Sequence, residues 1–135
     1  MPYSTHIMYT IVNDVAKYPE FLPWCSESRI LSQNDTSMKA SILMKKGRLN
    51  HWFSTQNMLE ADSKIEMSLI DGPFKRLDGV WKFIALDQQA SKIILDLNFE
   101  FSSGFVSTLA APVFTQIANT LVASFCTRAH EVNPV

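Results

Sequence analysis

The sequence has few charged residues and no clear excess of either sign. Charged residues make up 19% of the 135, and 12 basic against 13 acidic residues give a formal net charge of −1. The net charge of the protein therefore favours neither nucleic acid nor an anionic membrane as a partner, and only a local basic patch could attract one. The chain also lacks an apolar run of the roughly 20 residues that cross a bilayer.

The first residues lack the basic start and continuous apolar run of a signal peptide. The two cysteines, Cys25 and Cys126, have no second cysteine or histidine at metal-ligand spacing, so no metal site is predicted. Both are expected to be free, buried thiols in a reducing cytosol. We therefore expect a cytoplasmic protein that contacts the inner membrane, if at all, only peripherally.

Sequence motifs of catalysis are missing as well. HExxH, GxSxG, Walker A and GxGxxG do not occur, and the three histidines have no partners in a recognisable pattern. Asp14 is better explained as part of a solvated helix face, and Asp71 as part of a turn with Gly72 and Pro73. We therefore expect a protein that is not an enzyme and needs no cofactor.

Hydrophobic residues make up 47% of the chain, which is ample for the core of a single domain over residues 1–135. Ser4 is a candidate N-cap. Apolar residues then follow at helical spacing and predict a short amphipathic helix that ends before Pro19. These apolar residues are Met8, Ile11, Val12 and Val15. A second short turn is predicted over residues 20–24, between Pro19 and Pro23.

Alternation of apolar and polar residues predicts about six strands, over residues 28–33, 37–45, 51–59, 65–69, 80–86 and 93–101. Because short turns join them, they are expected to form an antiparallel meander. From Phe105 the apolar period becomes helical, and Pro112 is expected to kink this helix or begin a new segment. The order favours an α+β fold in which a curved sheet grips one long C-terminal helix.

Two stretches resemble a known family. The first is residues 13–25, followed by Ser28-Arg29-Ile30, and the second is residues 71–75, followed by Leu77, Trp81, Lys82 and Phe83. They resemble START-like proteins, a family that includes the mitochondrial coenzyme Q-binding protein and the bacterial ribosome association toxin RatA. The bacterial branch is the more similar, through residues 69–75 and the C-terminal Phe125, Arg128, Ala129, Glu131 and Val132. The resemblance covers essentially the whole chain.

The resemblance implies a helix-grip fold with a hydrophobic cavity between the sheet and the long helix. It also implies a strand before the first helix, which we expect to be missing because the sequence begins Met1-Pro2-Tyr3-Ser4. In the quinone-binding branch the cavity is associated with ubiquinone and respiration. Proteins of the toxin branch are described as binding the large ribosomal subunit and blocking subunit association.

The main hypothesis is a non-enzymatic binder of ubiquinone or another isoprenoid lipid that supports respiration. Three aromatic residues in hydrophobic loops are expected to gate the mouth of the cavity, namely Phe21, Trp24 and Phe74. The expected lining comes from inward strand positions and the helix stripe, namely Met44, Phe53, Leu69, Trp81, Phe99, Val113, Ile117 and Leu121. For each of these residues the alternative is a dry, filled core.

The alternative hypothesis is a RatA-type toxin that binds the large ribosomal subunit and inhibits translation. Phosphate contacts would come from five basic residues, which are Lys45, Lys46, Arg48, Lys75 and Arg76. A solvated hairpin turn would equally explain residues 45–48. A third possibility is an enzyme of the polyketide cyclase type, but the sequence offers no convincing acid–base pair. The natural ligand and the oligomeric state are left open.

Overall fold

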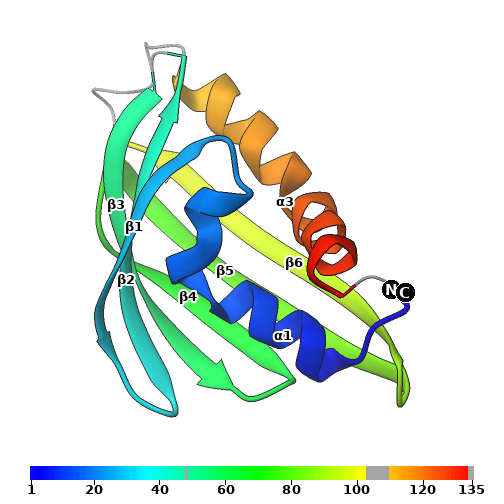
Figure 1. Ribbon diagram of the computed structural model, residues 1–135. Coiled ribbons are helices and arrows are strands. Elements are labelled where there is room, and N and C mark those ends of the chain that lie inside the picture. The colour runs from blue at the N-terminus through cyan, green and yellow to red at the C-terminus, as the bar shows by residue number, and fades with distance from the viewer. Residues whose placement is uncertain (48, 103–109, 134–135) are drawn as a thin grey trace.

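The sheet is an antiparallel meander in which neighbours in sequence are neighbours in space, in the order β1-β2-β3-β4-β5-β6. The computed structural model describes residues 1–47, 49–102 and 110–133. Its elements are α1 (Thr5–Asn13), the 3-10 helix η1 (Val15–Glu20), β1 (Cys25–Gln33), β2 (Ser37–Lys46), β3 (Leu49–Glu60), β4 (Lys64–Asp71), β5 (Phe74–Asp87), β6 (Ala90–Phe101) and α3 (Ala110–Val132). Figure 1 shows the curved sheet with the helices on its concave side. The predicted helix-grip fold of α+β class is confirmed.

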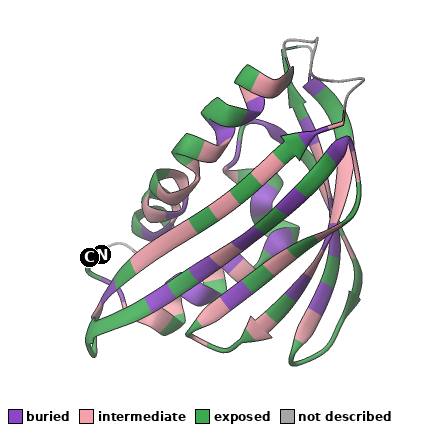
Figure 2. Ribbon diagram, turned by 180° about the vertical axis from the view of Figure 1, so that it is seen from behind, coloured by how far each residue is buried: buried purple, intermediate pink, exposed green. Residues whose placement is uncertain are grey.

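Burial alternates along the strands, as expected for a sheet with one covered face. Figure 2 shows this as alternating buried and exposed bands, most clearly on β5. The predicted fifth strand began at Val80, whereas β5 begins at Phe74. A register shift between Phe74 and Arg76 places two exposed basic residues in succession, and this interrupts the alternation that the prediction used.

The first helix begins as predicted but ends earlier. The Ser4 hydroxyl accepts a hydrogen bond from the Ile7 amide at 3.2 Å. The helix stops at Asn13 because Asp14 leaves helical geometry, with ψ of 66°. Val15 therefore belongs to η1 and not to the first helix, which was predicted to include it and to end before Pro19.

The long helix begins where its proline can be accommodated. Pro112 lies in the first turn of α3, where backbone N–H groups have no partner within the helix. The expectation that a segment starts near Pro112 is thus confirmed. The predicted start at Phe105 lies outside the described residues. The buried face of α3 includes Phe114, Ile117 and Phe125.

Strand β6 lies at an edge of the sheet and pairs only with β5 among the described strands. At its start, the Met1 amino group donates to the Ser91 carbonyl at 2.8 Å, and the Ser91 amide donates to the Met1 carbonyl at 3.0 Å. The Ser91 hydroxyl also donates to the Tyr3 carbonyl at 2.8 Å. The N-terminus therefore forms a single antiparallel pair with β6 before α1 begins.

Candidate functional site

An interior cavity of about 80 Å³ lies between the concave face of the sheet and α3. Its walls come from η1, the start of β1, the inward positions of β2 to β6, and one face of α3. Most of the lining is apolar, because inward strand positions and the buried helix stripe meet there. No carboxylate, lysine, arginine or histidine of the described chain lines it. The cavity is therefore suited to an uncharged guest.

Two adjacent inward positions of β3 make this cavity partly polar. Thr55 and Asn57 are 7% and 6% exposed, and the Thr55 hydroxyl donates to the Asn57 side-chain oxygen at 2.9 Å. Phe53 precedes them on the same face because side chains alternate along a strand. Asn57 lines the cavity, so its NH₂ group is a candidate donor to a molecule bound there.

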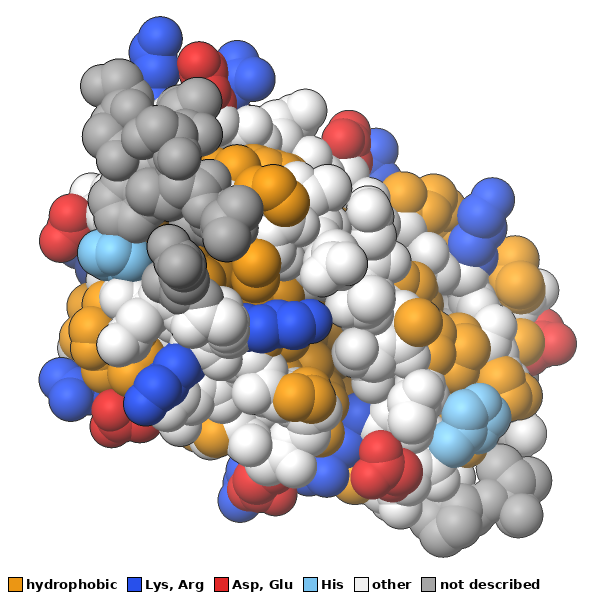
Figure 3. Space-filling model, turned by 90° about the horizontal axis from the view of Figure 1, so that it is seen from above, with side chains coloured by type: hydrophobic (Ala, Val, Ile, Leu, Met, Phe, Trp, Pro, Cys, Tyr) orange, Lys and Arg blue, Asp and Glu red, His pale blue; other side chains and the backbone are white. Residues whose placement is uncertain are grey.

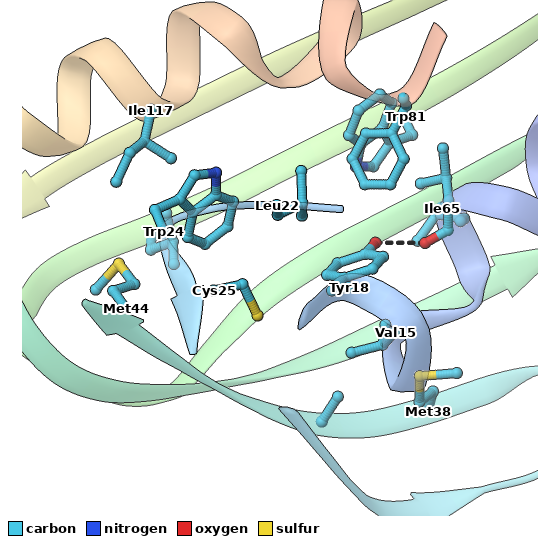
Figure 4. Packing of buried hydrophobic residues seen from close by; sticks show 14 of the residues in the cluster. Val15, Tyr18, Leu22, Trp24, Cys25, Met38, Met44, Ile65, Trp81 and Ile117 are labelled. Atoms are coloured by element: carbon cyan, nitrogen blue, oxygen red, sulfur yellow. Dashed lines mark hydrogen bonds between the residues drawn. The ribbon is translucent and has the colours of Figure 1, made fainter. Parts of the chain in front are cut away.

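Trp24 brings a second donor to the same space. It lies just before β1, is 8% exposed, and its indole Nε1 has no hydrogen-bond partner among the described residues. Figure 4 shows the nitrogen-bearing edge of this ring facing α3, near Ile117. An unpaired buried donor costs about 1–3 kcal/mol relative to a paired one. The cavity thus favours a guest that carries hydrogen-bond acceptors.

The ionisable groups next to the cavity are held neutral. Burial, with smaller contributions from Cys25 and Asp14, raises the pKa of the Tyr18 hydroxyl well above its usual range. That hydroxyl donates to the Val12 carbonyl, as the dashed line in Figure 4 indicates. Burial also raises the pKa of the Cys25 thiol to about 11. At neutral pH neither group carries a charge or acts as an anionic nucleophile.

The structure brings four of the predicted lining residues together around the cavity, namely Phe53, Trp81, Ile117 and Leu121, and Trp24, predicted as a gate residue, lines it as well. Met44, fully buried, lies outside it, as do the half-buried Leu69 and Val113. Phe99 lies outside as well and packs edge-on against Phe114, with ring centroids 4.7 Å apart. For these four residues the structure favours the filled-core alternative.

The predicted gate does not form as expected. Phe74 is 5% exposed and stacks on Phe101 with ring centroids 4.7 Å apart, because it is the first residue of β5 and not a loop residue. Trp24 is also buried, so neither ring stands at a solvent-facing mouth. Phe21 lines a separate surface groove of about 400 Å³ between α1, η1 and the end of α3. There the Arg128 guanidinium lies 4.9 Å from the Phe21 ring centroid and bonds Glu20 at 3.2 Å.

Thr55, Asn57 and Phe114 also line the cavity, and they are not among the lining residues predicted from sequence. The first two could have been found from their period-two spacing with Phe53, but the inward face of that strand was ambiguous. Phe114 was missed because the four-residue spacing counted from Phe105 favours Val113. The helical face is set by the neighbours of α3, and this places Phe114 on the cavity side.

The predicted basic contacts gather at one end of the sheet. Lys45 and Lys46 are exposed at the end of β2, and the start of β5 lies at the same end in Figure 1. Lys75 and Arg76 are also exposed, but each lies next to an acid. Lys75 Nζ is 3.8 Å from Glu100 Oε1, and Arg76 Nε is 4.0 Å from Asp78 Oδ1. Arg48 lies outside the described residues.

Within residues 1–47, 49–102 and 110–133, no group of three or more histidine, cysteine or acidic side chains is placed to hold a metal ion. Within the same ranges, no helix has both the length and the apolar character needed to cross a membrane.

Comparison with known proteins gives close relatives over nearly the full length. The chain is 46% identical to the ribosome association toxin RatA of Pseudomonas aeruginosa over 132 residues, which are 98% of this chain and 92% of that protein. It is 42% identical to RatA of Escherichia coli, covering 84% of it. Identity to the mitochondrial coenzyme Q-binding protein homolog B of Xenopus laevis is 28% over 91% of this chain and 52% of that protein.

Solved structures confirm the fold. An aromatase/cyclase from Streptomyces superposes with a TM-score of 0.84 over 98% of this chain and 91% of that one, at 14% identity. An 18 kDa protein of Caulobacter crescentus superposes with a TM-score of 0.75 over 100% of this chain and 94% of that one, at 28% identity. The sequence profile of polyketide cyclases, dehydrases and lipid-transport proteins matches residues 1–126. The chain therefore belongs to the polyketide cyclase/dehydrase and lipid-transport family, with RatA proteins among its relatives.

Proposed function

We propose that this protein is a non-enzymatic, ribosome-associating inhibitor of translation that binds the large ribosomal subunit. The observation that supports this most is the 46% identity to a ribosome association toxin, which extends over nearly the whole of both chains. The proposal replaces quinone binding, the main hypothesis from sequence, as the preferred function.

The size of the cavity argues in the same direction. A volume of about 80 Å³ accommodates roughly five to eight water-sized groups. A long isoprenoid tail has far more carbon atoms than this, so it would need a larger cavity or an exit to solvent. The cavity suits a compact guest better than a complete ubiquinone.

Co-sedimentation with purified ribosomal subunits tests the proposed function. We expect the protein to sediment with the large subunit, and we expect binding to weaken steeply between 50 and 200 mM salt because phosphate contacts release counterions. A matched sedimentation with small subunits alone serves as the control. Equal recovery with both subunits, or no recovery with either at low salt, would contradict the proposal.

A second candidate function is binding of a compact, uncharged ligand with hydrogen-bond acceptors. It is favoured by the buried, unpartnered Trp24 Nε1 and by Asn57, which also lines the cavity. Such a ligand could coexist with ribosome binding, because the cavity is interior and the proposed ribosome contacts are on the surface.

Solvent extraction of the purified native protein, followed by mass spectrometry, tests the second function. A bound acceptor-bearing molecule is expected at near-stoichiometric yield from the wild type. Asn57→Leu removes the donor at similar volume and should lower the yield about 5- to 10-fold, as expected for one lost buried hydrogen bond. Ile94→Leu, on the outward face of β6, is the control. An empty extract from folded wild-type protein would eliminate this function.

A further inference from the structure

The outward face of β1–β3 carries an aromatic ring that the fold does not need for its core. Trp52 is half-buried, whereas Trp24 and Trp81 are 8% and 3% exposed in the core. On β3 it alternates with the inward-facing Phe53 and Thr55, so its side chain points away from the cavity. Half-exposed Leu43 of β2 lies directly opposite it in the register. A tryptophan and a leucine paired on a solvent face are unusual unless something covers them.

Arg29 of β1 is placed over this ring. Its guanidinium carbon lies 4.6 Å from the centroid of the Trp52 ring. In the register, Arg29 is opposite Ser41, which is in turn opposite Ser54. The two serine hydroxyls are hydrogen-bonded to each other. Because serine side chains are short, the sheet surface beside the Trp52 ring is shallow. The sheet therefore presents a planar cation stacked on an aromatic ring, above a shallow floor.

Two lysines lie on either side of this stack. Lys39 and Lys45 share the outward face of β2 with Leu43, since all three alternate with buried Met38, Ala40 and Met44. Both lysines are exposed, and neither forms an ion pair with a described acid. They are six residues apart, or roughly 20 Å along the strand. Two acids lie next to these cations on the same face, Glu27 opposite Leu43 and Asp71 opposite Ser54, so the three cations outnumber the neighbouring acids by one.

We propose that this surface, the β1–β3 outer patch formed by Arg29, Lys39, Leu43, Lys45 and Trp52, binds RNA, and that the protein contacts ribosomal RNA through it. The proposal rests on the ribosome association proposed above. RNA fits because its phosphates need spaced cations, and its unstacked bases stack on aromatic rings and on guanidinium planes. Figure 3, a view from above, shows basic, acidic and hydrophobic side chains interspersed over the upper end of the molecule.

The rest of the surface is less suited to this partner. Lys75 and Arg76 face Glu100 and Asp78, and Arg128 is held by Glu20. Among the described residues, the outer patch combines unpaired cations with an accessible aromatic ring. It shares only Lys45 with the contacts predicted from sequence.

Two binding measurements test the patch. Titration with poly(U) is followed by tryptophan fluorescence, to which Trp52 contributes the accessible ring. Co-sedimentation with purified large ribosomal subunits is measured in parallel. Trp52→Thr keeps a strand-forming residue and should weaken poly(U) binding about 5- to 100-fold, the range found when a stacking aromatic is removed. Because that variant lacks the reporter, its binding is measured by filter retention.

The charge contribution has its own readout and a matched control. Three phosphate contacts to a single strand predict a log–log salt slope near −2. Arg29→Gln with Lys45→Gln should reduce the slope to about −0.7. Lys82→Gln with Lys92→Gln removes the same charge from exposed positions on β5 and β6 and should leave the slope unchanged. Thermal unfolding checks that each variant is folded.

The outcomes separate this proposal from the proposed function. If patch variants bind poly(U) and subunits as the wild type does, the patch proposal is wrong and ribosome association stands. If the patch variants lose subunit binding but the wild type does not bind poly(U), the partner is a ribosomal protein and the RNA proposal is overturned. If the wild type binds poly(U) through Trp52 but not subunits, the RNA surface stands without ribosome association. Failure of the wild type to bind either would overturn both.

Discussion

Replacing Gly72 with alanine is expected to destabilise the protein by about 2–6 kcal/mol. Gly72 has φ of +147°, a region that costs a non-glycine residue about 1–3 kcal/mol. A Cβ there would lie 2.7 Å from the Phe53 Cβ and 3.2 Å from the Phe53 Cα. These are atoms close to the backbone of β3, so relief requires a shift of the strand, which costs a further 1–3 kcal/mol or so.

Gly47→Ala is the matched control for this prediction. Gly47 also has positive φ, +60°, but a Cβ there meets nothing within 4 Å. It should therefore show only the backbone cost, about 1–2 kcal/mol. Urea denaturation of both variants measures the difference, which contains the contact with Phe53 together with any difference in backbone cost between φ of +147° and +60°. Equal destabilisation of the two variants would show that Phe53 moves at no cost.

The effect of Gly72 connects a sequence motif to the cavity. Asp71-Gly72-Pro73 was predicted as a turn from its residue types, and it does connect β4 to β5. Its close approach to Phe53 was not predictable, because it depends on how β3 and β4 pair around the register shift at Ser54 and Thr55. Since Phe53 lines the cavity, the turn contributes to the shape of the site as well as to strand pairing.

The architecture was predictable because its signals are local. Alternation marks each strand, and helical periodicity marks the last element. The predictions were wrong where the position of a residue depends on packing against another element of the fold. Phe74 was placed in a loop because a bulge hides the start of β5, and Val113 was preferred to Phe114 because packing sets the face of α3. The outer patch was missed for the same reason, since Arg29 and Trp52 meet only across two strand pairings.

The relation between cavity and stability can be tested at Phe125. This ring is 1% exposed, lines the cavity, and makes edge contacts to Tyr18, Phe21 and Trp81 with centroids 5.2, 5.4 and 5.2 Å away. Phe125→Ala should lower the free energy of unfolding by about 3–5 kcal/mol. Leu86→Ala, at a residue 63% exposed, should change it by less than about 0.5 kcal/mol.

The vacated volume gives this prediction a second readout. Removing the ring enlarges an existing apolar cavity, and such cavities bind small aromatic molecules. Benzene at 100 times its dissociation constant should restore about 2.7 kcal/mol to Phe125→Ala, because it binds only the folded state. The same benzene concentration should stabilise the wild type much less, since about 80 Å³ shared with Thr55 and Asn57 leaves little apolar room. Equal stabilisation of both would mean that the native cavity already accepts a ring, and that would strengthen ligand binding as a function alongside ribosome association.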